Sequence, residues 1–284
     1  MKTIKTIHLA LLASLLAGTA SLAHADDQGS AYVSAGAEYS SGKYGLDRAT
    51  TIWDVPLSAG YRGSRWSVGV TLPYLHVSGP GNVIPGVGVV VNTNPQTRGH
   101  GRGGSGGGTT TVITTPTTYA SGSASGIGDA VAQATFHAIQ DKNAGFALDL
   151  TGRIKFGTAS ADKGLGTGKN DYGAAADLHK TLGPAWMVFG GVAYTQLGSS
   201  TYLRLNNVWS ASAGASYAID RSNSAGLELF YQQKAADTAY TRREATLYYN
   251  HKFSQAWALR GYVLGGFADG SPDYGAGMSV RYSY

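Results

Sequence analysis

Residues Arg65–Tyr74 read RWSVGVTLPY, and large apolar side chains occupy every second position after the arginine. Successive side chains of a β-strand point to opposite faces, so this spacing predicts a strand with one apolar face. The positions between them carry Ser67, Gly69 and Thr71, which are small or polar. The apolar face is formed by Trp66, Val68, Val70, Leu72 and Tyr74.

The same period of two returns in two later segments. Phe146–Phe156 (FALDLTGRIKF) alternates apolar residues with Asp, Thr, Arg and Lys, and Tyr274–Tyr284 (YGAGMSVRYSY) alternates them with Gly, Ser and Arg. Each apolar stripe covers about ten residues, the length that a tilted strand needs to cross a bilayer. Aromatic residues at both ends of an outward apolar band are typical of outer-membrane barrels, and in lipid only a closed sheet satisfies strand backbones. The pattern predicts an all-β, transmembrane, antiparallel up-and-down barrel.

Twelve strands are predicted from the alternation and from the turn signals between them. Their connections alternate in length: every second one is short, such as RGSR or QDKN, and the others are longer. Outer-membrane barrels have short periplasmic turns and long extracellular loops, so both termini are expected in the periplasm. The predicted strands span 31–39, 49–61, 66–77, 126–139, 145–156, 171–181, 185–197, 207–219, 224–233, 241–253, 256–267 and 273–284.

One predicted extracellular connection, residues 78–125, is far longer than the others and rich in Gly and Thr. Its flanks, VIPGVGVVVN and TTTVITTPTTY, could pair as a hairpin above the membrane, with the Gly-rich piece as a flexible tip. Alternatively, the connection folds into the barrel and narrows it, because long loops are often functional. The sequence leaves both arrangements open.

Residues 1–25 have the features of a secretory signal peptide. Lys2 and Lys5 precede an apolar run from Leu9 to Leu22, and Ala23-His24-Ala25 forms a small-x-small cleavage site. The predicted mature protein, residues 26–284, is a single barrel exported through the periplasm to a bacterial outer membrane. No later segment offers about 18 uninterrupted apolar residues, so no transmembrane helix is predicted.

Composition excludes several classes of protein. The formal charge is +5, and removal of the two leader lysines lowers it to +3, spread along the chain. Nucleic acid is therefore not an expected partner, because nucleic-acid binding needs a concentrated basic face. The chain has no Cys, which excludes disulfides and Cys-ligated metal. The expected partners are outer-membrane lipid, the barrel assembly machinery and a small solute.

Charged side chains of both signs fall on the predicted lumen face of the strands. They could pair across strands and solvate the barrel interior, or they could form rings of charge that select the solutes that pass. Both interpretations stay open at this point. The residues concerned are Glu38, Asp54, Asp129, Asp149, Arg153, Lys155, Asp177, His179, Glu228, Glu244, Arg260 and Arg281.

Catalysis is not predicted. A lipase-type site would need Ser and His converging on the lipid face, but His137 and His179 fall on predicted lumen faces. No His pair stands at metal-binding spacing, and the G-x-S-x-G match at Gly103–Gly107 falls within the Gly-rich run GRGGSGGG, not between a predicted strand and a helix. We expect neither an enzyme nor a bound cofactor or metal, although an outer-membrane hydrolase remains a third alternative.

The stretch GLGTGKND, Gly164–Asp171, has the look of a phosphate-binding loop. A Walker loop, however, has Gly where this stretch has Lys163 and Ser or Thr where it has Asn170. The residues that follow, YGAAADLHKTL, alternate like a strand rather than opening a helix. Nucleotide binding is therefore not predicted here.

Two segments together resemble the outer-membrane transporter family of the meta-pathway of phenol degradation. In SGIGDAVAQATF, residues 125–136, the family's Gly-x-Gly-Asp element at a strand start is matched by Gly126, Gly128 and Asp129. Its Gly-Leu-Gly-Thr-Gly segment is matched by Lys163, Gly164, Leu165, Gly166, Thr167, Gly168 and Asp171. Between them, Gly157 stands where the family has Pro, and Ala159 stands where it has Gly.

This resemblance implies an outer-membrane channel for uptake of hydrophobic or aromatic compounds, with GLGTGKND as an extracellular loop. Asp129 and Asp171 share one rim, so we expect them to meet Lys155, Lys163 or Lys169 and fix that loop. By analogy with outer-membrane barrels generally, the C-terminal Tyr284 is expected to act as an assembly signal. The alternative is a barrel with no through-pore that acts as a surface-exposed structural or adhesive protein through residues 78–125.

Overall fold

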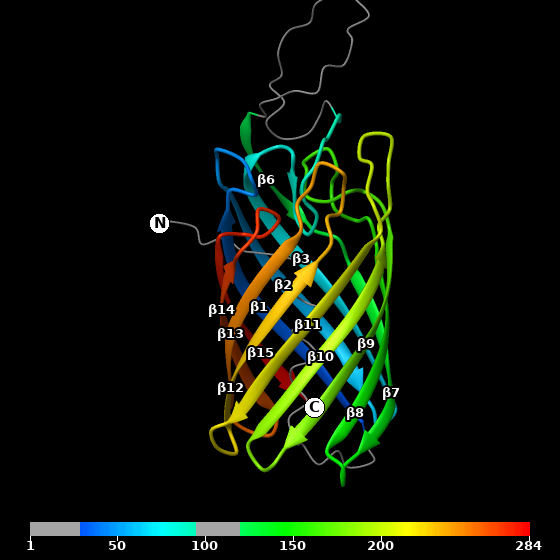
Figure 1. Ribbon diagram of the computed structural model, residues 1–284, viewed down its shortest axis with the longest axis vertical. Helices are drawn as coiled ribbons and strands as arrows, with labels where there is room; N and C mark the ends of the chain where they lie inside the picture. The colour runs from blue at the N-terminus through cyan, green and yellow to red at the C-terminus, as the bar shows by residue number, and fades with distance from the viewer. Residues whose placement is uncertain (1–28, 95–119) are drawn as a thin grey trace, which may run out of the picture.

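The computed structural model describes residues 29–94 and 120–284, which form one closed β-barrel (Figure 1). The predicted signal peptide, residues 1–25, lies outside the described residues, as do residues 95–119 of the long connection. Within the described residues, no helix is long and apolar enough to cross a membrane. The strands are β1 Ser30–Gly42, β2 Thr50–Arg62, β3 Trp66–Pro80, β4 Val83–Ile84, β5 Gly88–Val89, β6 Ser121–Ile127, β7 Val131–Asp141, β8 Phe146–Lys155, β9 Asp171–Leu182, β10 Trp186–Gln196, β11 Val208–Ala218, β12 Asn223–Gln232, β13 Arg242–Lys252, β14 Trp257–Gly266 and β15 Tyr274–Ser283.

The sheet closes on itself because its first and last strands pair. β1 and β15 run antiparallel from Tyr32 opposite Ser283 to Ser41 opposite Tyr274, and every other wall strand pairs with its sequence neighbours. β6 and β7 both pair with β3 and together make one wall strand. The wall therefore has twelve antiparallel strands, which confirms the predicted fold class.

The predicted continuous strand 126–139 is wrong in one respect, because it is broken between β6 and β7. Pro73 of β3 lies opposite the break and has no N–H to donate, although its carbonyl accepts from Gly128 N at 2.9 Å. Thr158 bridges the interrupted ladder: its hydroxyl donates to the Gly128 carbonyl and accepts from Ala130 N, both at 2.8 Å. Strand pairing also continues into the predicted connection 78–125, since β3 ends at Pro80 and β6 starts at Ser121.

The outer face of the barrel is apolar. Val68, Val70 and Leu72 are 50%, 57% and 43% exposed, which would be costly in water and suits a surface covered by lipid. Trp66 and Tyr74 are exposed at the two ends of this stripe. The long connections gather at one end of the barrel and the short turns at the other (Figure 1).

Two of the short turns share one hydrogen-bonding arrangement. The Asp220 carboxylate accepts from the backbone N–H groups of Ser222 and Asn223, at 2.7 and 2.8 Å. The Asn223 side-chain amide donates to the same carboxylate at 2.6 Å. This bond and the two backbone bonds lower the pKa of Asp220. Asp141 accepts in the same way from Asn143 N and Ala144 N. Such Asx turns explain why these connections read as tight turns in the sequence.

Inside the barrel, several aromatic rings lie across glycines of the neighbouring strand. The Tyr262 ring on β14 passes over Gly277 of β15 and donates its hydroxyl proton to Glu38 of β1 at 2.7 Å. A Cβ atom on Gly277 would lie 2.6 Å from Tyr262 Cε1 and 2.8 Å from its Cζ. Because Gly277 has no side chain, the Tyr262 ring can cross β15 and link β14 to β1.

We expect Gly277→Ala to destabilise the barrel by about 1–3 kcal/mol, because the new methyl group must displace the Tyr262 ring from Glu38. The matched control is Gly265→Ala on β14, where a Cβ atom meets nothing within 4 Å. Urea unfolding in lipid vesicles, followed by tryptophan fluorescence, measures both. Equal stability of the two variants would contradict the role assigned to Gly277.

Candidate functional site

A cavity of about 860 Å³ occupies the barrel lumen. It extends from Ser64 and Lys142 at the short-turn end to Pro85, Gly86 and Val87 near the long-loop end. Most of its wall comes from β7 to β11, and Tyr32 of β1 and Arg281 of β15 line it from the first and last strands. The cavity is therefore the part of the lumen able to hold a small molecule.

The upper end of the cavity is formed by the β4–β5 hairpin. Val83 pairs with Val89, and Val87 N donates to Ile84 O at 3.1 Å around a Pro85-Gly86 turn. Pro presets φ at the second turn position, and Gly86 supplies the φ of +77° that a type II turn needs at the third. The tip of this hairpin lines the cavity.

Both sides of this hairpin are packed against other loops. Val83 and Val89 contact Tyr44 of the β1–β2 loop. The opposite side packs on the β10–β11 and β12–β13 loops, in a buried cluster of Ile84, Val87, Val90, Leu203, Val208, Ala235, Ala236 and Ala239. The hairpin is thus seated among the loops at the barrel mouth, which agrees with the inward-folding alternative for the residues that the structure describes.

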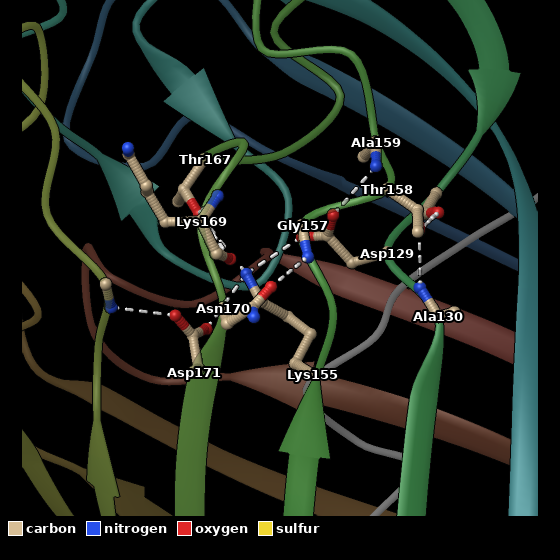
Figure 2. A network of polar contacts seen from close by, with 12 residues as sticks. Asp129, Ala130, Lys155, Gly157, Thr158, Ala159, Thr167, Lys169, Asn170 and Asp171 are labelled. Atoms are coloured by element: carbon tan, nitrogen blue, oxygen red, sulfur yellow. Dashed lines mark hydrogen bonds and ion pairs between the residues drawn. The ribbon is translucent and has the colours of Figure 1, made fainter.

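The motif loop between β8 and β9 is fixed by a buried ionic cluster (Figure 2). Lys155 Nζ lies 2.8 Å from Asp129 Oδ2 and 2.9 Å from Asp171 Oδ2, and it also donates to Thr167 Oγ1 at 3.3 Å. The other oxygen of Asp129 accepts from the backbone N–H of Ala159, and the other oxygen of Asp171 accepts from that of Gly198, both at 2.9 Å. The expected contact of both aspartates with a lysine is confirmed for Lys155.

The same loop also reaches into the lumen. Leu165 is 2% exposed and packs with Ile52, Leu75 and Val77 on the inner face of β2 and β3. Gly164 and Gly168 have φ of +63° and +66°, which side chains with a Cβ rarely adopt. At Gly166 a Cβ atom would lie 2.8 Å from Asp129 Oδ2. The glycines of the motif therefore let the loop turn inward and approach the ionic cluster.

The charged side chains predicted for the lumen divide into two groups. Seven of them line the cavity: Asp129, Asp149, Arg153, Lys155, Asp177, His179 and Arg281. The other five do not line it and are buried on β1, β2, β12, β13 and β14: Glu38, Asp54, Glu228, Glu244 and Arg260. Alternation along a strand identifies the inner face, but it does not say which part of that face is filled.

The second group belongs to a packed, polar region of the lumen. Arg242 Nη2 lies 2.7 Å from Glu244 Oε1, and the Arg260 guanidinium lies 4.1 Å from the centroid of the Tyr248 ring. Glu38 stands directly opposite Asp54 in the β1–β2 register. Arg242 and Glu244 lie on one strand, β13, and Glu38 faces another acid, so none of these contacts pairs opposite charges across strands.

One constellation was missed by the sequence analysis. Ser67 Oγ lies 2.8 Å from His137 Nε2, and His137 Nδ1 lies 2.7 Å from Asp149 Oδ1. The three residues come from β3, β7 and β8 and line the cavity. They have the order of a serine-hydrolase triad, but a regular strand carries Ser67, paired with Arg62 on one side and Thr135 on the other. The backbone N–H groups around Ser67 are thus used in the sheet. Acyl transfer needs free N–H groups that point at the oxyanion of the reacting substrate.

We therefore expect the Ser67–His137–Asp149 chain to hold strands together rather than to react. A fluorophosphonate probe should leave Ser67 unmodified, as judged by intact-protein mass spectrometry. His137→Ala should cost about 1–3 kcal/mol, because it leaves partners of two hydrogen bonds unpaired. A stoichiometric adduct that disappears in Ser67→Ala would show that the serine is a nucleophile.

Among the described residues, no group of three His, Asp or Glu side chains could hold a metal ion. Twelve antiparallel strands, an apolar outer band and a loop-covered lumen cavity define an outer-membrane β-barrel. The chain belongs to the family described as "Putative MetA-pathway of phenol degradation", whose model matches residues 24–284. This match confirms the resemblance found in its two motif segments.

Solved structures of outer-membrane barrels share the fold. The chain is similar to an outer-membrane channel from Pseudomonas putida F1, with a TM-score of 0.64, 14% identity and coverage of 92% of this chain and 97% of that chain. It is also similar to the NanC porin, with a TM-score of 0.51, 10% identity and coverage of 88% of this chain and 98% of that chain. None of the curated proteins matches this sequence. The similar structures are a channel and a porin, and the chain is a barrel of the bacterial outer membrane.

Proposed function

We propose that the barrel is a channel for passive uptake of small solutes across the outer membrane. The observation that carries this proposal is the cavity of about 860 Å³ inside a closed membrane barrel. A barrel that served only as a surface scaffold would need no such space. Side chains can fill the lumen of a twelve-strand barrel, as they do in this protein near Tyr248 and Tyr262. The similarity to a channel and a porin supports the same function.

The solute path in this proposal follows the wall formed by β7 to β11. Asp149, Arg153, Lys155, Asp177, His179 and Arg281 line the cavity and would contact a passing solute. The five buried charges on the other side support the wall. The solutes are small hydrophobic or aromatic compounds, which fits both the family's link to phenol degradation and the apolar residues at the upper end of the cavity, among them Leu75, Val87 and Leu165. No catalytic residue and no cofactor belong to this proposal.

The C-terminal residue has a part in assembly in the same proposal. Tyr284 N donates to Ala31 O at 2.9 Å, and the Ser30 hydroxyl donates to the Tyr284 carbonyl at 3.1 Å. The last residue thus sits at the seam between β15 and β1, where the barrel closes. An aromatic terminus at this seam suits recognition by the barrel assembly machinery before closure.

Single-channel conductance of the refolded protein in a planar bilayer tests the proposal. Discrete current steps, reduced when a permeating solute such as phenol is added, are the expected result. Folding is checked by heat-modifiable mobility on a gel. A folded barrel that passes neither ions nor, in liposome-swelling assays, small neutral solutes would overturn the channel and favour the structural or adhesive alternative.

A further inference from the structure

We infer that Arg153 forms a binding site for small carboxylates inside the cavity. This inference rests on the proposed function, because it names a class of solute for the same cavity. Arg153 lies on the inner face of β8 and lines the cavity. Among the described residues, its guanidinium group has no hydrogen bond and no ion pair.

The acids near Arg153 are already occupied. Asp171 acts on Arg153 electrostatically, but one of its oxygens is bound to Lys155 and the other accepts from Gly198 N. Asp129 is likewise bound to Lys155 and to Ala159 N. Each oxygen of both carboxylates therefore already has a partner in the ionic cluster that fixes the motif loop. Arg153 is left as a lumen cation without a bonded counter-ion.

The acids deeper in the lumen are too far away along the strand. Asp149 precedes Arg153 by four positions on β8, which corresponds to about 13 Å in a β-strand. Asp149 is held by His137 at 2.7 Å and stands opposite Asp177 in the β8–β9 register. The cavity wall on β8 therefore carries an unpaired positive charge near the motif loop, and an acidic pair lies nearer the short turns.

The surroundings of Arg153 offer room and additional polar groups. Gly173 stands opposite Arg153 on β9, so no side chain fills the space there, and Gln133 stands opposite it on β7. Gln133 and Thr151 also line the cavity. A planar guanidinium binds a carboxylate through two parallel hydrogen bonds, with the amide and hydroxyl as further donors.

The same cavity can hold the rest of such a ligand. Leu75, Leu165 and Val208 line it toward the hairpin. A compact apolar group would pack on these side chains while its carboxylate meets Arg153, whose half-buried charge is costly without a partner. A benzoate-sized aromatic carboxylate has both parts, and it fits within about 860 Å³.

Isothermal titration of the refolded protein in detergent with benzoate tests the site without requiring conduction. Saturable binding is expected for the wild type, with benzyl alcohol binding much more weakly because it lacks the charge. Arg153→Gln should weaken benzoate binding by about tenfold or more, since a charged, bidentate contact is lost. The matched control is Arg204→Gln, because Arg204 is exposed in the loop between β10 and β11 and does not line the cavity, and it should keep wild-type affinity.

Arg153→Lys covers the case in which the glutamine variant fails to fold. It keeps the charge and loses the planar fork, so its affinity should fall between those of the wild type and the glutamine variant. Wild-type benzoate affinity in both folded Arg153 variants, an equal loss in Arg204→Gln, or no benzoate binding by the wild type would each overturn the site. Conductance is measured separately: benzoate binding through Arg153 in a barrel that passes no solute would refute the channel and leave the carboxylate site standing.

Discussion

Replacement of residues 82–91 by a Gly-Ser linker of the same length should raise the single-channel conductance severalfold. The hairpin tip, Pro85 to Val87, lines the upper end of the lumen cavity, and Val83 and Ile84 are 0% and 1% exposed. A Gly-Ser linker has no apolar side chains to pack on the surrounding loops, so we expect it to move out of the barrel mouth into solvent. Because the hairpin packs mainly on loops and touches the wall only at Val208, the first residue of β11, the twelve-strand wall should survive the change.

The matched control replaces residues 95–119 by a linker of equal length and leaves the hairpin intact. Its conductance is expected to stay near that of the wild type. Heat-modifiable mobility must show that both variants are folded. If the conductance rises in the control and not in the hairpin variant, the constriction belongs to residues 95–119 and the role given to the hairpin is wrong.

Lys155→Met should destabilise the barrel by about 3–5 kcal/mol, because it leaves two buried carboxylates facing each other without their shared cation. The side chains of Lys155, Asp129 and Asp171 are 12%, 5% and 8% exposed, so water cannot replace the lost partner well. Asp129→Asn alone should have a smaller effect and increase protease cleavage within residues 157–170, since the charge pair that fixes this loop is lost. Urea unfolding in vesicles and limited proteolysis measure the two effects.

Two further variants distinguish the effect of breaking the ionic cluster from the effect of removing a lysine anywhere in this loop. Lys163→Met is the control in the same loop: within residues 29–94 and 120–284 its ammonium group donates only to the Ser125 carbonyl, at 3.3 Å, so a change of less than about 0.5 kcal/mol is expected. The triple variant with Lys155→Met, Asp129→Asn and Asp171→Asn should recover part of the loss, because amide oxygens can still accept from Ala159 N and Gly198 N. Lys155→Met as stable as Lys163→Met would show that the cluster contributes little.

The sequence was sufficient for the wall of the barrel and for one contact of the site. A period of two with aromatic ends predicts the lipid-facing stripe from Trp66 to Tyr74, because the membrane imposes this pattern on each strand separately. The pairing of Lys155 with Asp129 and Asp171 could also be anticipated, since all three residues stand at one rim. Each of these inferences depends on position within a single strand or at its end.

Features that depend on several strands at once could not be predicted. The break between β6 and β7 arises from Pro73 on the neighbouring strand and from Thr158 on a distant loop. The Ser67–His137–Asp149 chain needs the register of three strands. In the same way, alternation could not show that Glu38 and Asp54 lie in a filled region whereas Asp149 and Arg153 face open space.

The division of the lumen into a filled side and an open side has a consequence for how such barrels can diversify. The side chains that fix the seam, such as Glu38 and Tyr262, are different from those that would meet a solute, such as Arg153 and Asp177. Mutations on β7 to β11 can therefore alter the preferred cargo while the seam keeps the barrel closed. Protein engineers can use the same separation and redesign one wall for a new compound while leaving the opposite wall untouched.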